Sequence, residues 1–328
     1  MRRREFVTFS IALFGLPIQA RAQQQDRKRR IAIMIAPAEN DPEGQARVRA
    51  FRSTLQSLGW TEGKNLEIDY RWESGPDRST NYAAELVKLV PEVIVANGTP
   101  AVTAVQRATR SIPVVFVVVV DPVGAGVVQN LARPGGNITG FSTFEPDMGT
   151  KWLELLKEAS PSIRRVGVIW DPGFKGFLSL RNAIESAAKR LGLEAASVPF
   201  HDSRDDIQSS IASLAGNSGA GLIVLPTTLN HTHRERIYAL AVRHRLPAIY
   251  PFRHYATDGG LMAYGFDNND LFKRSALYVH RILKGESPGQ LPVQAPTKFA
   301  LIVNLKAARA IGLTISESFL LRADELID

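Results

Sequence analysis

The sequence predicts an α/β protein built as two doubly wound lobes, each with a parallel sheet, and a ligand crevice between them. Short runs rich in valine and isoleucine alternate with stretches whose apolar residues recur every three to four positions, as strands alternating with helices do. The strand runs are apolar at nearly every position, which is typical of parallel strands covered on both faces. The alternation occurs twice within 328 residues, so each repeat is long enough for one domain.

The first repeat has strand runs bounded by proline, glycine or asparagine, which we expect at 31–36, 66–72, 93–96 and 114–120. Between them, the spacing of apolar residues predicts helices at 42–58, 78–90 and 100–110. Gly135 and Gly136 predict a turn into one further strand, because glycine accepts the positive backbone angles that tight turns require.

The second repeat follows the same plan. Its strands are expected at 166–170, 195–200, 221–225, 248–250 and 260–264. Its helices are expected at 176–191, 204–215 and 232–245. Two such units joined in the middle leave a crevice at the carboxyl ends of both sheets, which is where open α/β sheets bind ligands.

Residues 1–22 predict an export signal. Arginines cluster at positions 2–4, the segment 7–20 is largely apolar, and Ala20-Arg21-Ala22 is a small-residue cleavage site. The apolar segment is shorter than the roughly 20 residues that a helix needs to cross a bilayer, which favours a signal over an anchor. The arginine pair followed by Phe6 and Val7 is similar to a twin-arginine signal, although an ordinary secretory signal with extra arginines stays an alternative. We therefore expect a soluble, exported protein in the periplasm, with no stable membrane insertion.

Charge and cysteine content argue against several classes of function. The formal net charge of +8 is spread along the chain, and the one basic block, 27–30, is expected to be solvated rather than to bind nucleic acid. The chain has no cysteine, which excludes disulfides, a thiol nucleophile and a thiolate metal site. His231 and His233 have the wrong spacing for two metal ligands on one helical face, so we expect surface histidines. Neither a metal nor a cofactor is predicted.

Motifs for catalysis are weak. The segment 124–129 begins like a dinucleotide fingerprint, but it lacks the third glycine and follows the fourth strand instead of the first. The sequence contains no G-x-x-x-x-G-K-[ST] phosphate loop and no G-x-S-x-G nucleophile elbow. An exported α/β enzyme of unknown reaction stays the alternative to a binding protein. A sensory domain is a third hypothesis, but no fused DNA-binding or membrane-spanning segment is seen.

Polar and aromatic residues at the expected strand ends are the candidates for ligand binding. Hydroxyls, amides, carboxylates and aromatic rings suit the binding of a small molecule better than they suit catalysis. The candidate ligand-binding residues are Asn40, Thr99, Asp121, Ser142, Thr143, Trp170, Asp171, Thr227, Tyr250 and Phe252. No catalytic residue is predicted.

Three of these candidates have an alternative structural role. Thr99 before Pro100 is expected to cap a helix, whose exposed amides attract a ligand carboxylate, and the alternative is a cap and nothing more. Asp121 and Asp171 each precede a proline, once in each repeat. Each is either a turn residue that bonds the following backbone or a partner for a ligand ammonium or hydroxyl group.

Several segments in order resemble one family of transport proteins. These are the run FVVVVDPVGAGVVQNLARPGGNITGFS at 116–142, the glycine-rich motifs at 59–65 and 259–265, and the segments 281–285 and 304–308. Together they resemble the TrpX-like substrate-binding proteins of ABC transporters, which have the type I periplasmic-binding-protein fold. The resemblance covers nearly the whole chain.

The resemblance implies a receptor that closes on a small solute and delivers it to a membrane permease. It implies hinge crossings near 142–147, 265–268 and 288–297, which makes Ser142 and Thr143 stronger candidates for ligand contact. It implies that lobe 1 consists of 30–143 plus 267–290 and lobe 2 of 144–266 plus 296–328. The implied ligand is a small carboxylate-bearing solute, with an aromatic or branched-chain amino acid or a related acid as candidates. A monomer without enzymatic activity is expected.

Overall fold

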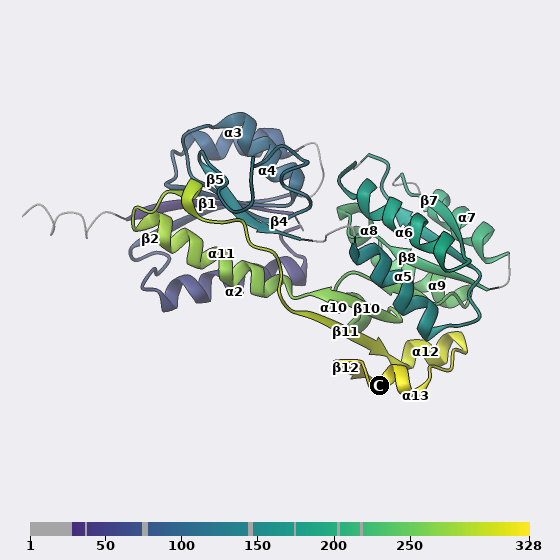
Figure 1. Cartoon of the computed structure of the whole chain (residues 1–328). Helices are drawn as coiled ribbons and strands as arrows, with labels where there is room; N and C mark the ends of the chain where they lie inside the picture. Colours follow the sequence, from purple (N-terminus) through teal and green to yellow (C-terminus); the bar gives the residue numbers. More distant parts are fainter. Residues whose placement is uncertain are drawn as a thin grey trace, which may run out of the picture.

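The computed structural model describes residues 28–36, 38–73, 78–143, 147–173, 175–201, 204–216 and 219–328. It contains two α/β lobes, each built around its own sheet (Figure 1). The predicted fold class is therefore confirmed. The predicted export signal at 1–22 lies outside the described residues.

Lobe 1 contains a five-stranded parallel sheet with the strand order β2-β1-β3-β4-β5. Its strands are β1 (Arg29–Ile35), β2 (Leu66–Trp72), β3 (Val93–Asn97), β4 (Val114–Val119) and β5 (Ile138–Ser142). The helices packed on it are α2 (Pro42–Ser57), α3 (Ser79–Lys88), α4 (Thr99–Ala108) and α11 (Asn268–Leu283). The order places β1 next to β3, so the chain reverses its winding between them, as a doubly wound sheet requires.

Both faces of this sheet are buried, as the apolar strands predicted. Alternate residues of β1 enter different cores: Ile31 and Ile33 pack with Phe51 of α2, whereas Met34 packs with Leu86 of α3 on the other face. Helices α2 and α11 lie together on the first face, and α3 and α4 cover the second (Figure 1).

Lobe 2 contains a seven-stranded sheet with the order β12-β11-β10-β9-β8-β6-β7. Its strands are β6 (Arg165–Trp170), β7 (Glu194–Pro199), β8 (Ala220–Val224), β9 (Ala248–Tyr250), β10 (Met262–Phe266), β11 (Phe299–Asn304) and β12 (Glu325–Ile327). The helices packed around it are α5 (Asp147–Ala159), α6 (Leu178–Arg190), α7 (Arg204–Ala215), α8 (Thr228–Thr232), α9 (Arg234–Arg243), α10 (Arg253–Thr257), α12 (Leu305–Ile311) and α13 (Glu317–Leu320).

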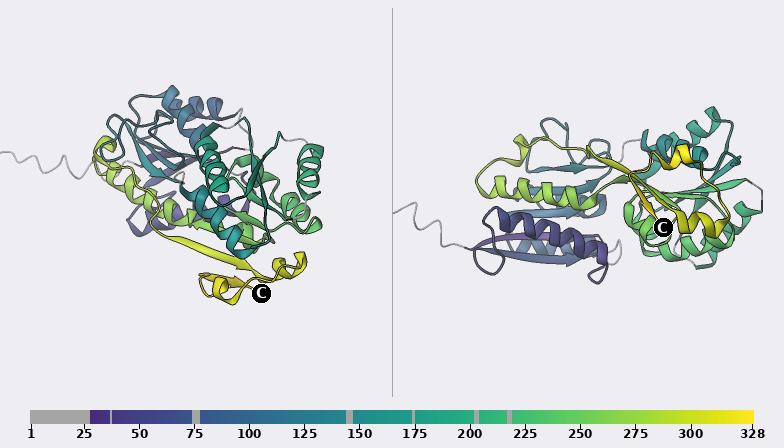
Figure 2. Two further views of the ribbon diagram at one scale, coloured as in Figure 1. Left: turned by 45° about the vertical axis from the view of Figure 1, so that its right-hand side comes forward. Right: turned by 90° about the horizontal axis from the view of Figure 1, so that it is seen from below.

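One pair of strands in this sheet departs from the predicted parallel arrangement. Strands β10 and β11 are antiparallel, with Phe266 opposite Phe299. The reason is the path of the chain: it leaves the sheet at the end of β10, forms α11 on lobe 1, and returns through β11 at the same edge. Figure 2 shows β11 running beside this exit. The other strand pairs of the sheet are parallel.

Helix and strand boundaries differ from the prediction at a few places. The helix expected at 232–245 is α9, which begins at Arg234, and a separate short helix, α8, precedes it with Thr227 as its N-cap. The strand expected at 260–264 lies at Met262–Phe266. The helix α5, with 13 residues, was not predicted. The short elements α8, α10, α12, α13 and β12 were not predicted either, since each lacks a long periodic pattern.

The segment before β11 is fastened to lobe 1 by hydrogen bonds. Thr139 Oγ1 donates to the carbonyl of Leu291 at 2.6 Å, and the amide of Ser142 donates to the carbonyl of Gln294 at 2.9 Å. Asp267 caps α11 by accepting a bond from the amide of Asn269 at 2.8 Å, so the helix begins directly after β10 ends. Within the described ranges, none of the helices combines the length and the apolar character needed to span a bilayer.

Candidate functional site

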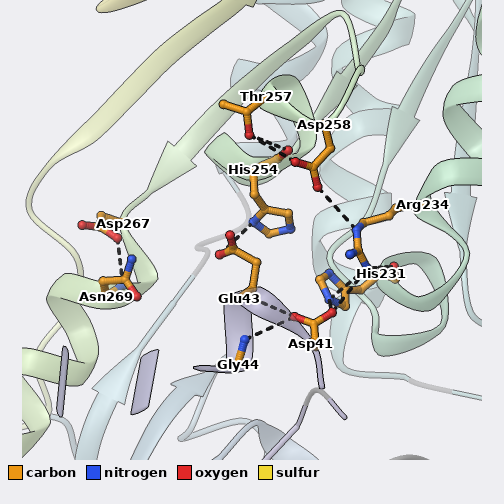
Figure 3. Close-up of polar contacts among 10 residues, drawn as sticks. All are labelled: Asp41, Glu43, Gly44, His231, Arg234, His254, Thr257, Asp258, Asp267 and Asn269. Carbon is orange, nitrogen blue, oxygen red and sulfur yellow. Dashed lines mark hydrogen bonds and ion pairs between the residues drawn. The ribbon is translucent and has the colours of Figure 1, made fainter. Parts of the chain in front are cut away.

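The carboxyl ends of the two sheets meet at the start of α2. Asp41 follows β1 and uses its two carboxylate oxygens differently. Oδ1 accepts the backbone amides of Glu43 and Gly44 at 2.9 and 3.2 Å, which caps α2. Oδ2 lies 3.0 Å from Nε2 of His231, which belongs to α8 of the other lobe (Figure 3). The Asp41 side chain is therefore both a helix cap and a contact between the lobes.

Further polar contacts surround this pair. Nη1 of Arg234 lies 3.5 Å from Oδ2 of Asp41, and Oε2 of Glu43 lies 3.4 Å from Nδ1 of His254 (Figure 3). We call Asp41, Glu43, His231, Arg234 and His254 the interlobe cluster. Its two carboxylates come from lobe 1, and its histidines and arginine come from lobe 2.

The electrostatics of the cluster favour ionised carboxylates. Burial opposes the charge of Asp41, yet the bond from His231, the Gly44 amide and the Arg234 guanidinium hold its pKa well below the usual range. The hydrogen bond from His254 also lowers the pKa of Glu43. Burial lowers the pKa of His254 itself, even though the Glu43 carboxylate acts in the opposite direction. A neutral His254 imidazole that carries its proton on Nδ1 donates to Glu43, which fits the lowered pKa of both groups.

The predicted role of Thr99 as a helix cap is wrong. Thr99 is the first residue of α4, and the N-cap is Gly98, which makes no side-chain cap hydrogen bond. Gly98 has a φ of 91°, a backbone angle that glycine accepts and other residues resist, so the helix starts one residue earlier than expected. The first turn of α4 therefore has no side-chain cap from the preceding residue.

Asp121 and Asp171 both make the turn bond that was one of their two predicted roles. Oδ1 of Asp121 accepts the amide of Gly124 at 2.9 Å, and Oδ1 of Asp171 accepts the amide of Gly173 at 2.8 Å. Asp121 is exposed, with a φ of 41°. A contact of either residue with a ligand stays a prediction.

The other lobe 1 candidates differ in their surroundings. Asn40 is exposed and lies next to Asp41 without being part of the interlobe cluster. Ser142 is buried, and its hydroxyl lies 3.4 Å from the carbonyl of Gln294. Thr143 is buried as well, but its Oγ1 has no hydrogen-bond partner among the described residues. Because a buried hydroxyl is costly to leave unpaired, Thr143 is the stronger candidate for a ligand contact.

The lobe 2 candidates are held mainly by their own lobe. Nε1 of Trp170 donates to Ser197 at 2.7 Å, and the Arg181 guanidinium lies 4.3 Å from the centre of its ring. Thr227 caps α8 by accepting the amide of Asn230 at 3.1 Å.

Two aromatic candidates lie at the end of β9, where Tyr250 is its last residue, and just beyond it. Tyr250 is 1% exposed, and its hydroxyl has no partner among the described residues. Phe252 stacks on the ring of His254 with centroids 5.9 Å apart, which places it beside the interlobe cluster. Of these two side chains, Phe252 is therefore the one that contacts a residue of the interlobe cluster.

The prediction of a surface position for His231 is wrong, because its side chain is 14% exposed and contacts Asp41. Asp41 itself was missed, although aspartate followed by proline is a recognised helix start. No local signal marks His254 and Arg234, since their carboxylate partners lie in the other lobe or far away in the chain. Among the described residues, no group of three or more histidine, aspartate or glutamate side chains is placed to hold a metal ion.

Two buried asparagines that sequence reasoning missed hold the strand ends in place. Asn97 accepts the amide of Ala36 at 3.2 Å and donates to the carbonyl of Val117 at 3.3 Å. Asn230 donates to the carbonyls of Leu225 and Ile169 at 2.8 and 3.2 Å. Its Oδ1 is buried without a partner in the described part of the chain. Each lobe thus uses one asparagine to tie loops at the carboxyl edge.

Two hollows in lobe 2 lie apart from the interlobe cluster. The smaller, about 10 Å³, is lined by Tyr238, Tyr250 and Gly260 among others. The larger, about 260 Å³, is lined by residues that include Ser160, His244 and Gly312, at the amino edge of the sheet. Both hollows therefore lie outside the region where the carboxyl ends of the two sheets meet.

A comparison with protein families decides the identity of the chain. The model of the ABC transporter substrate-binding protein family matches residues 31–327. The chain belongs to this family. It is a substrate-binding protein of an ABC transporter, as the resemblance in the sequence implied.

Relatives of this substrate-binding protein span nearly its whole length. A tyrosine-binding protein of Clostridioides difficile is 26% identical over 293 residues, which cover 89% of this chain and 84% of the relative. The structure of a conserved domain protein from Vibrio cholerae is 30% identical, with a TM-score of 0.84 over 92% of this chain and all of the other. A Streptococcus pneumonia ABC domain in complex with L-Trp has a TM-score of 0.83 at 22% identity, over 92% of this chain and 100% of that one.

One further relative is a substrate-binding protein with adhesive properties from Clostridium difficile in a ligand-free, open structure. It is 25% identical and has a TM-score of 0.69 over 91% of this chain and 99% of its own. Because the chain belongs to a family of transporter substrate-binding proteins, it is not an enzyme.

Proposed function

We propose that this substrate-binding protein holds an amino acid, of aromatic character and with a free carboxylate, between its two lobes and delivers it to the permease of an ABC importer. The observation that carries the proposal is that the carboxyl ends of both sheets meet across a polar boundary, at Asp41 and His231. Open α/β sheets bind their ligands at these ends. The tyrosine-binding relative and the L-Trp-bound structural relative support an aromatic amino acid.

The proposed ligand contacts are the ten residues predicted from the sequence, with different support for each. Thr143 offers a buried hydroxyl that has no partner among the described residues, and Phe252 offers an apolar ring beside the cluster. The start of α4, where no side chain caps the helix, is the proposed seat of the ligand carboxylate, because free helix amides attract anions. The remaining contacts are proposed for Asn40, Asp121, Ser142, Trp170, Asp171, Thr227 and Tyr250.

The lobes are proposed to comprise 30–143 plus 267–290 and 144–266 plus 296–328, with hinges at the crossings between them. Hinge closure around a ligand is the common motion of two-lobed binding proteins. Small-angle scattering is expected to give a smaller radius of gyration with saturating ligand than without it. An unchanged radius at saturation would contradict hinge closure.

Export to the periplasm through the segment 1–22 and action as a monomer belong to the same proposal. A chain that collects solute for a permease has to reach the outer side of the inner membrane, and the predicted signal supplies the route. The partner is the permease, and no nucleic acid is involved.

The test of the proposed ligand is a thermal-shift and calorimetry series on residues 28–328. L-Tryptophan, L-tyrosine, L-phenylalanine and L-leucine are compared with their amides and with a neutral sugar. A ligand at 100 times its Kd is expected to raise the free energy of unfolding by about 2.7 kcal/mol. The amides and the sugar are expected to give no shift. If no amino acid gives a saturable heat or a shift at millimolar concentration, the amino-acid proposal is wrong.

A further inference from the structure

Arg47 is buried at the boundary between the lobes, with no ion-pair partner among the described residues. It lies on α2, one turn after Glu43, and is 6% exposed. Its Nε has no hydrogen-bond partner, and its guanidinium forms no ion pair with a residue that the structure describes. Burying a cation is costly unless it is paired, and arginine is almost never fully buried alone. The unpaired state of Arg47 is therefore an unfavourable feature of this lobe arrangement.

A partner for Arg47 is present on its own helix. Glu43 precedes Arg47 by four residues, and glutamate four positions before a basic residue is the favoured order for a helical ion pair. Here the Glu43 carboxylate instead lies 3.4 Å from Nδ1 of His254, across the boundary. Burial lowers the pKa of Arg47, while the charges of Glu43 and Asp41 act in the opposite direction, so the three side chains are electrostatically linked.

We propose that Glu43 changes partner when the lobes move: it bonds His254 of lobe 2 when the lobes touch through the interlobe cluster, and it pairs with Arg47 of its own helix when they separate. Each lobe arrangement then gains one Glu43 contact and loses the other. The exchange keeps the energies of the two arrangements close, which is what a hinge protein needs to switch on a modest signal. This inference rests on the lobe motion of the proposed function and goes beyond it, because it concerns the protein without ligand.

When the lobes touch, the contacts of Asp41 with lobe 2 offset the unfavourable burial of Arg47. Asp41 bonds His231 at 3.0 Å and lies 3.5 Å from Arg234, and both contacts are broken when the lobes part. The N-cap bonds of Asp41 to Glu43 and Gly44 lie within lobe 1 and persist. Asp41 thus favours contact between the lobes, while the Glu43–Arg47 pair favours separation.

The experiment measures the distance between two spin labels in the ligand-free protein by pulsed electron resonance. The chain has no cysteine, so Arg107→Cys on α4 and Lys189→Cys on α6 provide one label site in each lobe. Arg47→Met, which keeps an unbranched apolar stem and removes the charge, is expected to shift the population toward the shorter distance by at least about twofold. His254→Gln is expected to shift it toward the longer distance. Glu286→Gln, which breaks an exposed pair with Arg281 within lobe 1, is the control and leaves the distances unchanged.

A double-variant cycle isolates the exchange of partners. In a Glu43→Gln background, Arg47 has no carboxylate to gain, so Arg47→Met is expected to shift the population less than it does in the wild type. An equal shift in both backgrounds would mean that Arg47 acts through its burial alone, and the proposal would be overturned. An unchanged or longer distance in Arg47→Met, or an unchanged distance in His254→Gln, would overturn it as well. Circular dichroism of each variant verifies that it is folded.

Discussion

Asp41 Oδ2 and His231 Nε2 are 3.0 Å apart although the two residues are separated by 190 positions in the chain. The contact joins the first helix of one lobe to a short helix of the other. Because Asp41 also caps α2, a single carboxylate couples a local feature, the start of a helix, to the relative position of the lobes.

Two substitutions at Asp41 separate its roles. Asp41→Asn keeps a side-chain oxygen for the cap, whereas Asp41→Ala removes both the cap and the interlobe contact. We expect Asp41→Ala to lower the free energy of unfolding by about 1 kcal/mol more than Asp41→Asn does. Urea denaturation of both variants measures the difference. Equal stabilities would show that the cap contributes nothing measurable.

Much of the fold was predictable because its signals are local. The apolar run at β1 and the helical spacing of α2 follow from neighbouring residues, and both elements lie within two residues of their expected bounds. The antiparallel direction of β11 was not predictable, since it depends on where the chain re-enters lobe 2 after α11.

The site was predicted less well than the fold. The choice of strand ends led to Asn40, but the side chain that contacts lobe 2 is its neighbour Asp41. No local pattern marks His254 as a partner of Glu43, because that contact exists only once both lobes have folded and met. The cap at α4 was assigned to Thr99 because hydroxyl residues are the common choice, whereas the positive φ of Gly98 is set by the loop.

Thr143 tests whether an unpaired buried hydroxyl serves the ligand. Thr143→Val removes the hydroxyl and keeps the shape, so folding stability is expected to stay equal or rise. Affinity for the amino acid found in the screen is expected to fall by about tenfold, roughly the effect of losing one hydrogen bond. Calorimetry and thermal unfolding are measured on the same samples.

The matched control for Thr143 is Thr139→Val on the same strand run. Its hydroxyl donates to the carbonyl of Leu291 at 2.6 Å, so its loss is expected to cost about 1 kcal/mol of stability. If Thr143→Val binds the amino acid with wild-type affinity, the Thr143 hydroxyl does not contact the ligand.

The pH dependence of stability follows from His254. Burial lowers its pKa below the ordinary value of about 6.5, so the unfolded chain binds a proton more readily than the folded one. The free energy of unfolding is therefore expected to decrease as the pH falls below about 6.5. Glu73 changes the pH dependence of stability in the opposite direction, since burial raises its pKa. Because Glu73 is present in both the wild type and the variant, its effect cancels in their difference.

The measurement is the difference between the wild type and His254→Gln in urea denaturation at several pH values from about 8 to about 5, which span the ordinary histidine pKa. The wild type is expected to lose more stability than the variant over this range. Parallel pH profiles would contradict a lowered pKa at this position.

Gly140 tests the close approach of β4 and β5. Its φ is 157°, and a Cβ added there would lie 2.1 Å from the carbonyl oxygen of Phe116. Gly192 also has a positive φ, 65°, but a Cβ added there would meet nothing within 4 Å, so it reports backbone strain alone. Gly140→Ala is expected to destabilise the protein by more than about 3 kcal/mol, and Gly192→Ala by about 1 kcal/mol. Similar losses of stability for the two variants in thermal unfolding would show that β4 and β5 can move apart to accommodate the added Cβ.

The start of α4 provides the last prediction. Because Gly98 and not Thr99 is the N-cap, Thr99→Val is expected to change folding stability by less than about 0.5 kcal/mol, in contrast to the loss of a true cap. If the amides of this helix receive the ligand carboxylate, binding requires the free acid, and the amide of the same amino acid is expected to give no measurable heat. Raising the salt concentration is expected to weaken binding little, since charges enclosed between two lobes are poorly screened. Calorimetry of the acid and its amide at low and high salt measures both effects. Equal affinity for the acid and the amide would exclude an anion site at α4 and would leave the other polar candidates, such as Thr143, to hold the ligand.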